Sequence, residues 1–139
     1  MVRTTFQKRL DDILDEVLVL GSMVEQAILE SVEYLKKRDF VRSQKVIDQD
    51  RIINKRRFDI EEEVLVLIAT QQPMACDLRM LAAILEIVTE LERIGDYAKG
   101  ISKINLMIGD EPFLKPLVDI PRMADKACDM LHRALDAFV

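Results

Sequence analysis

Apolar residues recur along the first part of the chain at alternating steps of four and three positions. This heptad-like spacing is typical of a helix that packs along its length against a nearly parallel or antiparallel partner. The positions that share the stripe are Phe6, Leu10, Ile13, Val17, Leu20, Val24, Ala27 and Ser31. The sequence therefore predicts a long first helix with one side buried in a helical bundle.

Two further long helices are predicted from the same periodicity and from its interruptions. Asp39 is a candidate N-cap for a second helix, which runs from residue 40 to about residue 71 without glycine or proline. Pro73 suits the first turn of a third helix, because its missing N–H would be unpaired there in any case. We expect this third helix to continue to about residue 108.

A fourth helix is predicted after the stop signal Gly-Asp-Glu-Pro at residues 109–112. Five residues of the first helix recur in it 107 positions later: Leu10, Asp12, Ile13, Met23 and Ala27 match Leu117, Asp119, Ile120, Met130 and Ala134. Two amphipathic helices can also match by chance, but the five identities favour duplication. We predict a three-helix repeat over 1–109, followed over 110–139 by a linker and the first helix of an incomplete second repeat.

The composition agrees with an all-α fold and excludes several classes of function. The 139 residues are 50% hydrophobic but only 5% aromatic, with no Trp and four residues each of Gly and Pro. A net charge of −5 with both signs interspersed argues against nucleic-acid binding. The longest apolar runs, such as residues 64–69, are too short to span a bilayer. No leader peptide is visible, and two cysteines without metal-type spacing predict buried thiols in a reducing cytoplasm.

The third helix carries an acidic pair inside a strongly apolar stretch. Glu92 and Asp96 are four residues apart and therefore share one helix face, in line with Leu81 and Leu85. Two neighbouring carboxylates repel each other unless a cation or a shared proton compensates them. Gly95 lies beside the pair at a helix cost of about 1 kcal/mol, which usually has a packing or access reason. We expect either a metal ion or a lysine at this position.

The second helix shows a matching irregularity. Asp50, Asn54 and Glu61 interrupt its otherwise apolar stripe, and burying such groups without partners is costly. Carboxylates that project inward from neighbouring helices form metal sites in helical bundles. Because all of these candidate ligands are oxygens, Mg²⁺, Mn²⁺ or iron is favoured over a cysteine-bound zinc.

A structural ion-pair network is an alternative to a metal ion at these acidic residues. It would join Asp96 to Lys99 or Lys103, and Arg57 to Glu61 or Asp50. The chain would then be a purely structural helical oligomerisation module. A carboxylate-metal enzyme is a third class, but the sequence has no histidine ligand set, nucleophile–base pair or Gly-rich phosphate loop. These absences argue against an enzyme.

Four segments in a fixed order carry a more specific signal. They are Leu-Gly-Ser-Met-Val-Glu-Gln-Ala-Ile at 20–28, Val-Ile-Asp-Gln-Asp-Arg-Ile-Ile-Asn at 46–54 with Ile-Glu at 60–61, Gln-Gln-Pro-Met-Ala-Cys-Asp-Leu-Arg at 71–79, and Leu-Glu-Arg-Ile-Gly-Asp-Tyr-Ala at 91–98. In these segments the chain resembles the PhoU family of phosphate-signalling proteins. The resemblance implies an up-down, spectrin-repeat-like bundle with two three-helix repeats, usually a homodimer in the cytoplasm.

The resemblance also implies a site and a role. Family members bind metal through Glu/Asp-x-x-x-Asp motifs, which Glu92 and Asp96 match, so iron, manganese, magnesium or zinc is expected. Four further positions match the family as well: Asp50, Asn54, Glu61 and Asp77. The implied role is a cytoplasmic adaptor between the ATPase subunit of the phosphate ABC transporter and a sensor histidine kinase. It would restrain the phosphate regulon when phosphate is plentiful, without catalysis, nucleic-acid binding or membrane insertion.

Length is where the chain departs from the resemblance. Family proteins complete a second bundle with its own acidic motif, whereas this sequence ends at Val139 after the fourth helix. An isolated fourth helix would leave its apolar stripe exposed to water. We therefore expect it to pack either on the first bundle or on another protomer.

Overall fold

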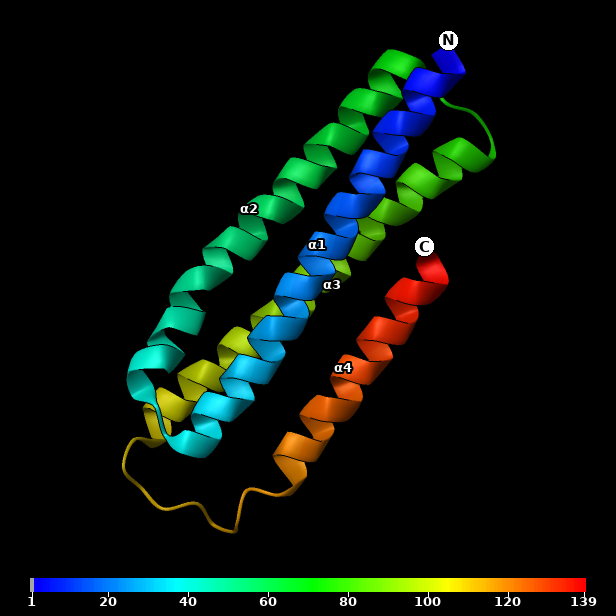
Figure 1. The fold of residues 1–139 in the computed structure, drawn as a ribbon. Coiled ribbons are helices and arrows are strands. Elements are labelled where there is room, and N and C mark those ends of the chain that lie inside the picture. Colours follow the sequence, from blue (N-terminus) through cyan, green and yellow to red (C-terminus); the bar gives the residue numbers. More distant parts are fainter. Residues whose placement is uncertain (1) are drawn as a thin grey trace.

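The protein is a bundle of four helices, each antiparallel to the one before it (Figure 1). The computed structural model describes residues 2–139, and side chains from Arg3 onward. The helices are α1 (Val2–Lys37), α2 (Phe40–Gln71), α3 (Cys76–Ile108) and α4 (Asp119–Phe138). The predicted all-α class is confirmed.

The helix ends follow local capping chemistry. The Asp39 carboxylate accepts a hydrogen bond of 3.0 Å from the backbone N–H of Arg42, so α2 begins where the sequence predicts. The prediction that Pro73 opens α3 is wrong, because α3 begins at Cys76. Gln72 and Ala75, on either side of this segment, have φ angles of 45° and 51°. These left-handed residues cannot belong to a right-handed helix, so the chain makes a short turn around Pro73 before α3 begins.

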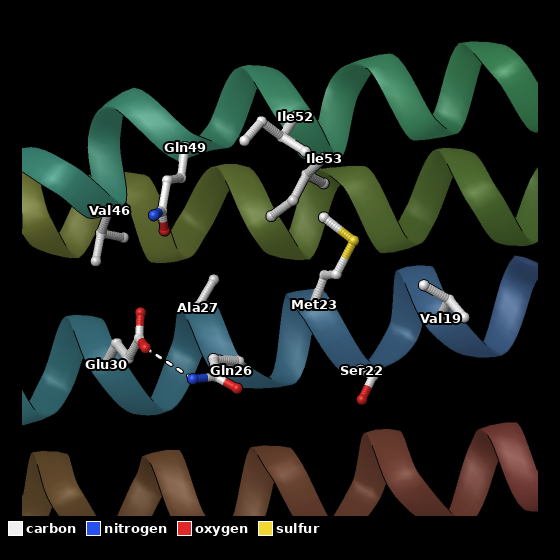
Figure 2. Close-up of a pocket in the computed structure, with 10 residues that line it drawn as sticks. All are labelled: Val19, Ser22, Met23, Gln26, Ala27, Glu30, Val46, Gln49, Ile52 and Ile53. Carbon is white, nitrogen blue, oxygen red and sulfur yellow. Dashed lines mark hydrogen bonds between the residues drawn. The ribbon is translucent and has the colours of Figure 1, made fainter.

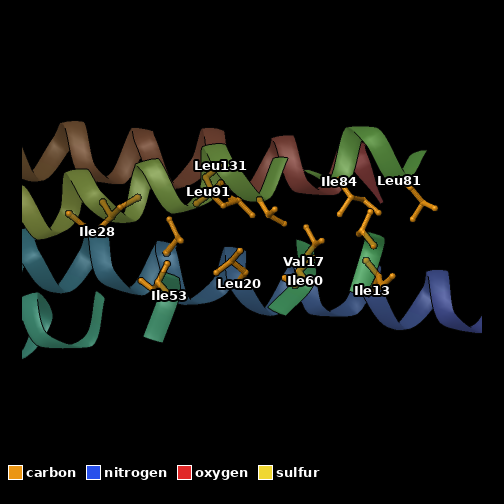
Figure 3. Close-up of a cluster of buried hydrophobic side chains, with 14 of the residues drawn as sticks. Ile13, Val17, Leu20, Ile28, Ile53, Ile60, Leu81, Ile84, Leu91 and Leu131 are labelled. Atoms are coloured by element: carbon orange, nitrogen blue, oxygen red, sulfur yellow. The ribbon is translucent and has the colours of Figure 1, made fainter. Parts of the chain in front are cut away.

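The core is centred on α1, which packs against each of the other three helices. Its predicted stripe is confirmed: Phe6, Leu10, Ile13, Val17, Leu20, Val24 and Ser31 are buried, and Ala27 is partly buried. Figure 3 shows side chains from all four helices in this core, with Leu131 contributed by α4. Burial of such apolar surface is the main force that holds the helices together.

A polar layer crosses the bundle near the turn between α1 and α2. The Asn105 side-chain amide donates hydrogen bonds of 2.8 Å to Ser43 Oγ and 3.1 Å to the backbone carbonyl of Tyr34. Asn105 and Ser43 are buried. One amide therefore joins α3 to both α1 and α2, and hydrogen-bond geometry fixes their lengthwise register at this level.

The fourth helix packs on α1, which confirms the first of the two arrangements expected for it. Ala124, Cys128 and Leu131 are its buried residues. Across the described residues, α4 makes no close backbone contact with α2 or α3. An apolar groove of about 690 Å³ therefore opens between α3 and α4, with α1 as its floor. Its walls include Ile94, Tyr97, Ile101 and Ile104 from α3 and Ile120, Met123, Ala127 and Met130 from α4.

The linker before α4 is held by one arginine. Arg38, which follows α1, donates hydrogen bonds to the backbone carbonyls of Gly109, at 3.0 Å, and Glu111. Its guanidinium also stacks over the Phe113 ring, 4.1 Å from the ring centroid. These contacts anchor the start of the linker to the turn between α1 and α2. No helix within residues 2–139 combines the length and the apolar character that crossing a bilayer requires.

Candidate metal centre

Three carboxylates from two helices meet at the α2–α3 interface. Asp50 comes from α2, and Glu92 and Asp96 come from consecutive turns of α3. One oxygen of each residue lies within 4.8 Å of the others. Asp50 is buried, Glu92 is half-buried and Asp96 is exposed. The cluster therefore has a buried base and an open side through which an ion can enter.

Gly95 gives the cluster its space. This buried glycine lies on α3 opposite Asp50 and Ile53 of α2. A Cβ atom at this position would lie 3.4 Å from Ile53 Cγ2 and 3.7 Å from Asp50 Oδ1. Those contacts would be close but tolerable, whereas a longer side chain would fill the space in front of the Asp50 carboxylate. Gly95 thus allows close packing of α2 on α3 and leaves room beside the Asp50 carboxylate. Packing and access are the two reasons that the sequence suggested for a glycine inside this helix.

The electrostatics of the cluster are dominated by Asp50. It is only 2% exposed, and neither of its carboxylate oxygens has a hydrogen-bond partner. Burial raises the pKa of Asp50, Lys99 opposes this effect, and the charge of Asp96 adds to it. The Lys99 Nζ atom lies 3.6 Å from Asp50 Oδ2. A buried carboxylate without hydrogen bonds is unusual, and its unpaired oxygens are suitable ligands for a cation.

The remaining predicted ligands lie elsewhere on the two helices. Asn54 is half-buried one turn along α2 from Asp50, so its side chain shares that face. Glu61 pairs with Arg57 at 3.2 Å, and its carboxylate lies 3.5 Å from the Thr89 hydroxyl. Asp77, in the first turn of α3, forms an ion pair with Arg3 of α1. The structure therefore does not bring Glu61 or Asp77 into the carboxylate cluster.

One partner in the cluster differs from the expectation based on helix spacing. Lys99 pairs with Asp50 across the helix interface, whereas the sequence suggested a pair with Asp96 on the same helix. The predicted pair between Arg57 and Glu61 is present. Spacing along one helix reveals only the partners on that helix, so the cross-helix pair had no signal in the sequence.

The donor set determines which ions the cluster suits. Asp50, Glu92 and Asp96 supply only oxygen atoms and a formal charge of −3 when ionised. Hard cations such as Mg²⁺, Mn²⁺ and iron prefer oxygen ligands, whereas structural zinc is usually bound by Cys or His. The orphaned oxygens of Asp50 and the space beside Gly95 fit such an ion. The cluster is therefore chemically suited to a divalent or trivalent metal ion.

A second concave region, which the sequence did not reveal, lies between α1 and α2 (Figure 2). Its volume is about 590 Å³. Figure 2 shows Met23 of α1 and Ile53 of α2 pointing toward one another across it. At its edge, Gln26 donates a hydrogen bond of 2.8 Å to Glu30. Among the described residues that line the groove, only Glu30 is ionisable, so the groove lacks the convergent charges of the carboxylate cluster.

The fold and the cluster together define an all-helical, antiparallel bundle protein with an oxygen-only carboxylate site between two of its helices. The family model described as PhoU domain matches residues 17–104. The chain therefore belongs to the PhoU family, as its motifs indicated.

Individual relatives agree with this assignment. The phosphate-specific transport system accessory protein PhoU homolog of Clostridium acetobutylicum is 36% identical over 140 residues, a match that covers 100% of this chain and 64% of the relative. The PhoU accessory protein of Escherichia coli (strain K12) is 33% identical over 133 residues, which are 96% of this chain and 55% of the relative. The chain thus spans roughly 55–64% of the length of these two relatives.

A solved structure has the same fold. The crystal structure of the phosphate transport system regulatory protein PhoU from Streptococcus pneumoniae superposes with a TM-score of 0.86 at 26% sequence identity. The match covers 95% of this chain and 62% of that one. The relatives carry the names of accessory and regulatory proteins rather than of enzymes.

Proposed function

We propose that this chain regulates phosphate uptake and phosphate-regulon signalling as a helical adaptor in the cytoplasm. The observation that carries the proposal is its similarity, over nearly its whole length, to phosphate-specific transport accessory proteins. Its partners would be the ATPase subunit of the phosphate ABC transporter and a sensor histidine kinase. The chain would restrain the regulon when phosphate is plentiful, and it would do so without catalysis.

The adaptor would bind one divalent or trivalent cation. Its ligands would be Asp50, Glu92 and Asp96, with the Asn54 amide oxygen beside them. The clustered carboxylate oxygens and the unpaired Asp50 side chain support this assignment. A bound ion would neutralise the repulsion among the three carboxylates and hold α2 against α3. Glu61 and Asp77, which also match family positions, would stabilise the helices through their ion pairs with Arg57 and Arg3.

The assembly would follow from the apolar face that α4 leaves open. We assign residues 1–109 to one PhoU-like repeat and α4 to the first helix of a second. Tyr97 of α3 is 61% exposed in the groove, and Met123 and Met130 of α4 are 62% and 69% exposed. Exposed apolar surface of this kind favours association, and we propose a homodimer. Light scattering at micromolar concentration would detect it, and a clean monomer would contradict it.

Complementation tests the regulatory role. Alkaline phosphatase output would be measured at high phosphate in a strain without the gene, with and without the 139-residue chain restored. We expect derepression on deletion and repression when the chain returns. Derepression that the chain does not reverse would show that these residues are insufficient for regulation. The absence of derepression would contradict the proposed function.

The metal site is tested independently of regulation. Asp96→Ala should lower the metal content of the purified protein while helicity, measured by circular dichroism, stays nearly unchanged. Glu90→Ala is the matched control, because Glu90 is an exposed acid of α3 outside the cluster. Equal metal content in the two variants would contradict the assignment.

One observation favours a second candidate, a purely structural module. Lys99 already gives Asp50 a positive partner, and Arg57 neutralises Glu61, so the acidic residues could serve packing alone. Stoichiometric metal in protein purified without added salts would exclude this alternative. Protein that takes up no metal even when it is supplied would favour it.

A further inference from the structure

Asp50 is the only charged residue that is buried among those the structure describes. The other buried polar residues are serines and Asn105, which carry no charge. An ionised carboxylate in such a place needs a cation nearby, because its desolvation cost is otherwise several kcal/mol. In the metal-free protein, this cation must therefore come from a neighbouring side chain.

Lys99 supplies that cation. It lies one turn after Gly95 on α3, and its Nζ atom is 3.6 Å from Asp50 Oδ2. This separation is longer than a hydrogen bond, so the ammonium compensates the charge of Asp50 without satisfying either of its oxygens. The Lys99 side chain is 29% exposed, whereas that of Asp50 is 3% exposed. The lysine thus reaches inward from the surface, and its path back to solvent is open.

A metal ion bound by the carboxylates would compete with this ammonium. A hard cation binds carboxylate oxygens at about 2.0–2.6 Å, so an ion on Asp50 would share this carboxylate with the Lys99 ammonium, which lies 3.6 Å from Oδ2. Two positive charges a few ångströms apart repel each other, most strongly on the buried side of the cluster next to Asp50. The Asp50 carboxylate can therefore hold either the Lys99 ammonium or the metal ion at close range, but not both.

We propose that Lys99 is the resident counter-cation of the metal-free site and that a bound metal ion displaces its ammonium from Asp50 into solvent. This inference rests on the metal site proposed above. The Lys99 side chain would then have two positions, one turned inward on Asp50 and one turned outward into solvent. The protein surface beside Asp96 then carries a free ammonium only when the metal is bound.

Metal affinity measures the competition directly. Mn²⁺ binding to the full chain would be followed by calorimetry for the wild type, Lys99→Met and Lys103→Met. Methionine keeps the length and apolar character of the lysine stem but removes its charge. Lys103, an exposed residue one turn further along α3, is the control for a general loss of positive charge. We expect Lys99→Met to bind Mn²⁺ roughly tenfold more tightly than the wild type, and Lys103→Met to stay within about threefold.

Lysine labelling measures the displacement of the Lys99 ammonium in the wild-type protein, so it needs no variant. Acetic anhydride labelling with mass spectrometry would give the acetylation rate of each lysine with and without Mn²⁺. We expect Mn²⁺ to increase the rate at Lys99 and to leave the rate at Lys103 unchanged.

The outcomes separate the inference from the proposed metal site. If the wild type binds Mn²⁺ but Lys99→Met binds no more tightly than Lys103→Met, or labelling of Lys99 does not increase, the exchange is overturned and the metal site stands. If only Lys99→Met binds Mn²⁺, the lysine does occupy the site, and the metal site is overturned for the natural chain. If neither protein binds Mn²⁺, both proposals fail.

Discussion

Asn105 of α3 donates a hydrogen bond of 2.8 Å to Ser43 of α2 inside the bundle, away from water. The same amide reaches the backbone carbonyl of Tyr34 on α1. A buried polar group of this kind contributes modestly when it is paired, but its partners become costly once it is removed. The three helices are therefore coupled through the Asn105 side chain, and no apolar side chain could donate these hydrogen bonds.

Replacing this side chain should destabilise the protein. We expect Asn105→Leu to lower the free energy of unfolding by about 1–3 kcal/mol, because Ser43 Oγ and the Tyr34 carbonyl lose their donor. Urea denaturation monitored by circular dichroism would measure the change. Ser102→Ala is the control, because the Ser102 hydroxyl is buried without a partner and its loss orphans nothing. A loss of stability in the control as large as that in Asn105→Leu would contradict this cause.

The two cysteines should differ strongly in reactivity. Cys76 is exposed at the start of α3, whereas Cys128 is buried between α4 and α1. Burial raises the pKa of the Cys128 thiol, and the charges of Glu25 and Asp125 act in the same direction, so less of the reactive thiolate is present. Iodoacetamide at pH 8 should alkylate Cys76 at least about tenfold faster than Cys128. Peptide mass spectrometry would give both rates, and comparable rates would mean that α4 leaves α1 readily.

A substitution at Gly21 should loosen α4. A Cβ atom at Gly21 would lie 2.4 Å from Leu135 Cδ1 of α4, closer than two carbon atoms can approach. A methyl group could be accommodated by rotation of Leu135, but Gly21→Leu would need the volume that Leu135 occupies. We expect this variant to increase the alkylation rate of Cys128. Gly100→Leu is the control, because a Cβ built there has no heavy atom within 4 Å other than those of the adjoining helix backbone and chain neighbours. An unchanged alkylation rate of Cys128 in Gly21→Leu would show that α4 stays packed on α1 despite the larger side chain.

Glu63 should make stability depend on pH. Glu63 lies at the surface, but partial desolvation of its carboxylate raises its pKa, and the charges of Glu16, Asp59 and Asp12 raise it further. The folded state therefore favours the protonated carboxyl. The stability associated with Glu63 is present below the unfolded-state pKa and is lost as pH rises through the raised folded-state value. Glu63→Gln has no carboxyl group to ionise, so the variant should not lose this stability as the pH rises.

The expected gain for Glu63→Gln is a few tenths of a kcal/mol at pH 7 and close to zero at pH 3, because the site is exposed and screened by solvent. Urea denaturation at the two pH values would measure it. The gain at pH 7 should also shrink in 1 M salt. Glu62→Gln, at the exposed neighbouring position, should show a smaller difference between the two pH values. A gain for Glu63→Gln that is equal at both pH values would contradict the electrostatic cause.

Much of the fold follows from periodicity and capping in the sequence. The α2 boundaries were predicted correctly because Asp39 caps the helix and no glycine or proline interrupts it. The start of α3 was placed too early because Pro73 is compatible with a first turn. The left-handed conformations of Gln72 and Ala75, two non-glycine residues, had no sequence signal. The buried position predicted for Cys76 is wrong for the same reason, since the shorter α3 leaves this cysteine exposed at its end.

The candidate site was predictable in composition but not in geometry. The spacing of Glu92 and Asp96 placed both on one face, and the interruption of the α2 stripe marked Asp50. Periodicity carries no information on the lengthwise register between α2 and α3, so it could not separate Asp50, which joins the cluster, from Glu61, which does not. The apolar residues of α3 serve two surfaces: Leu91 packs in the core, whereas Ile101 lines the open groove.

The contact between α1 and α4 joins segments about a hundred positions apart in the sequence, as the Cys128 contact with Glu25 illustrates. Closing so long a loop costs chain entropy before any packing is gained. The contacts between α1 and α2 and between α2 and α3, in contrast, form across the short turns at 38–39 and 72–75. We therefore expect α4 to dock last during folding and to detach first under mild denaturation. The backbone amides of α4 should exchange their hydrogens well before those of the other helices, so the molecule behaves as two cooperative units.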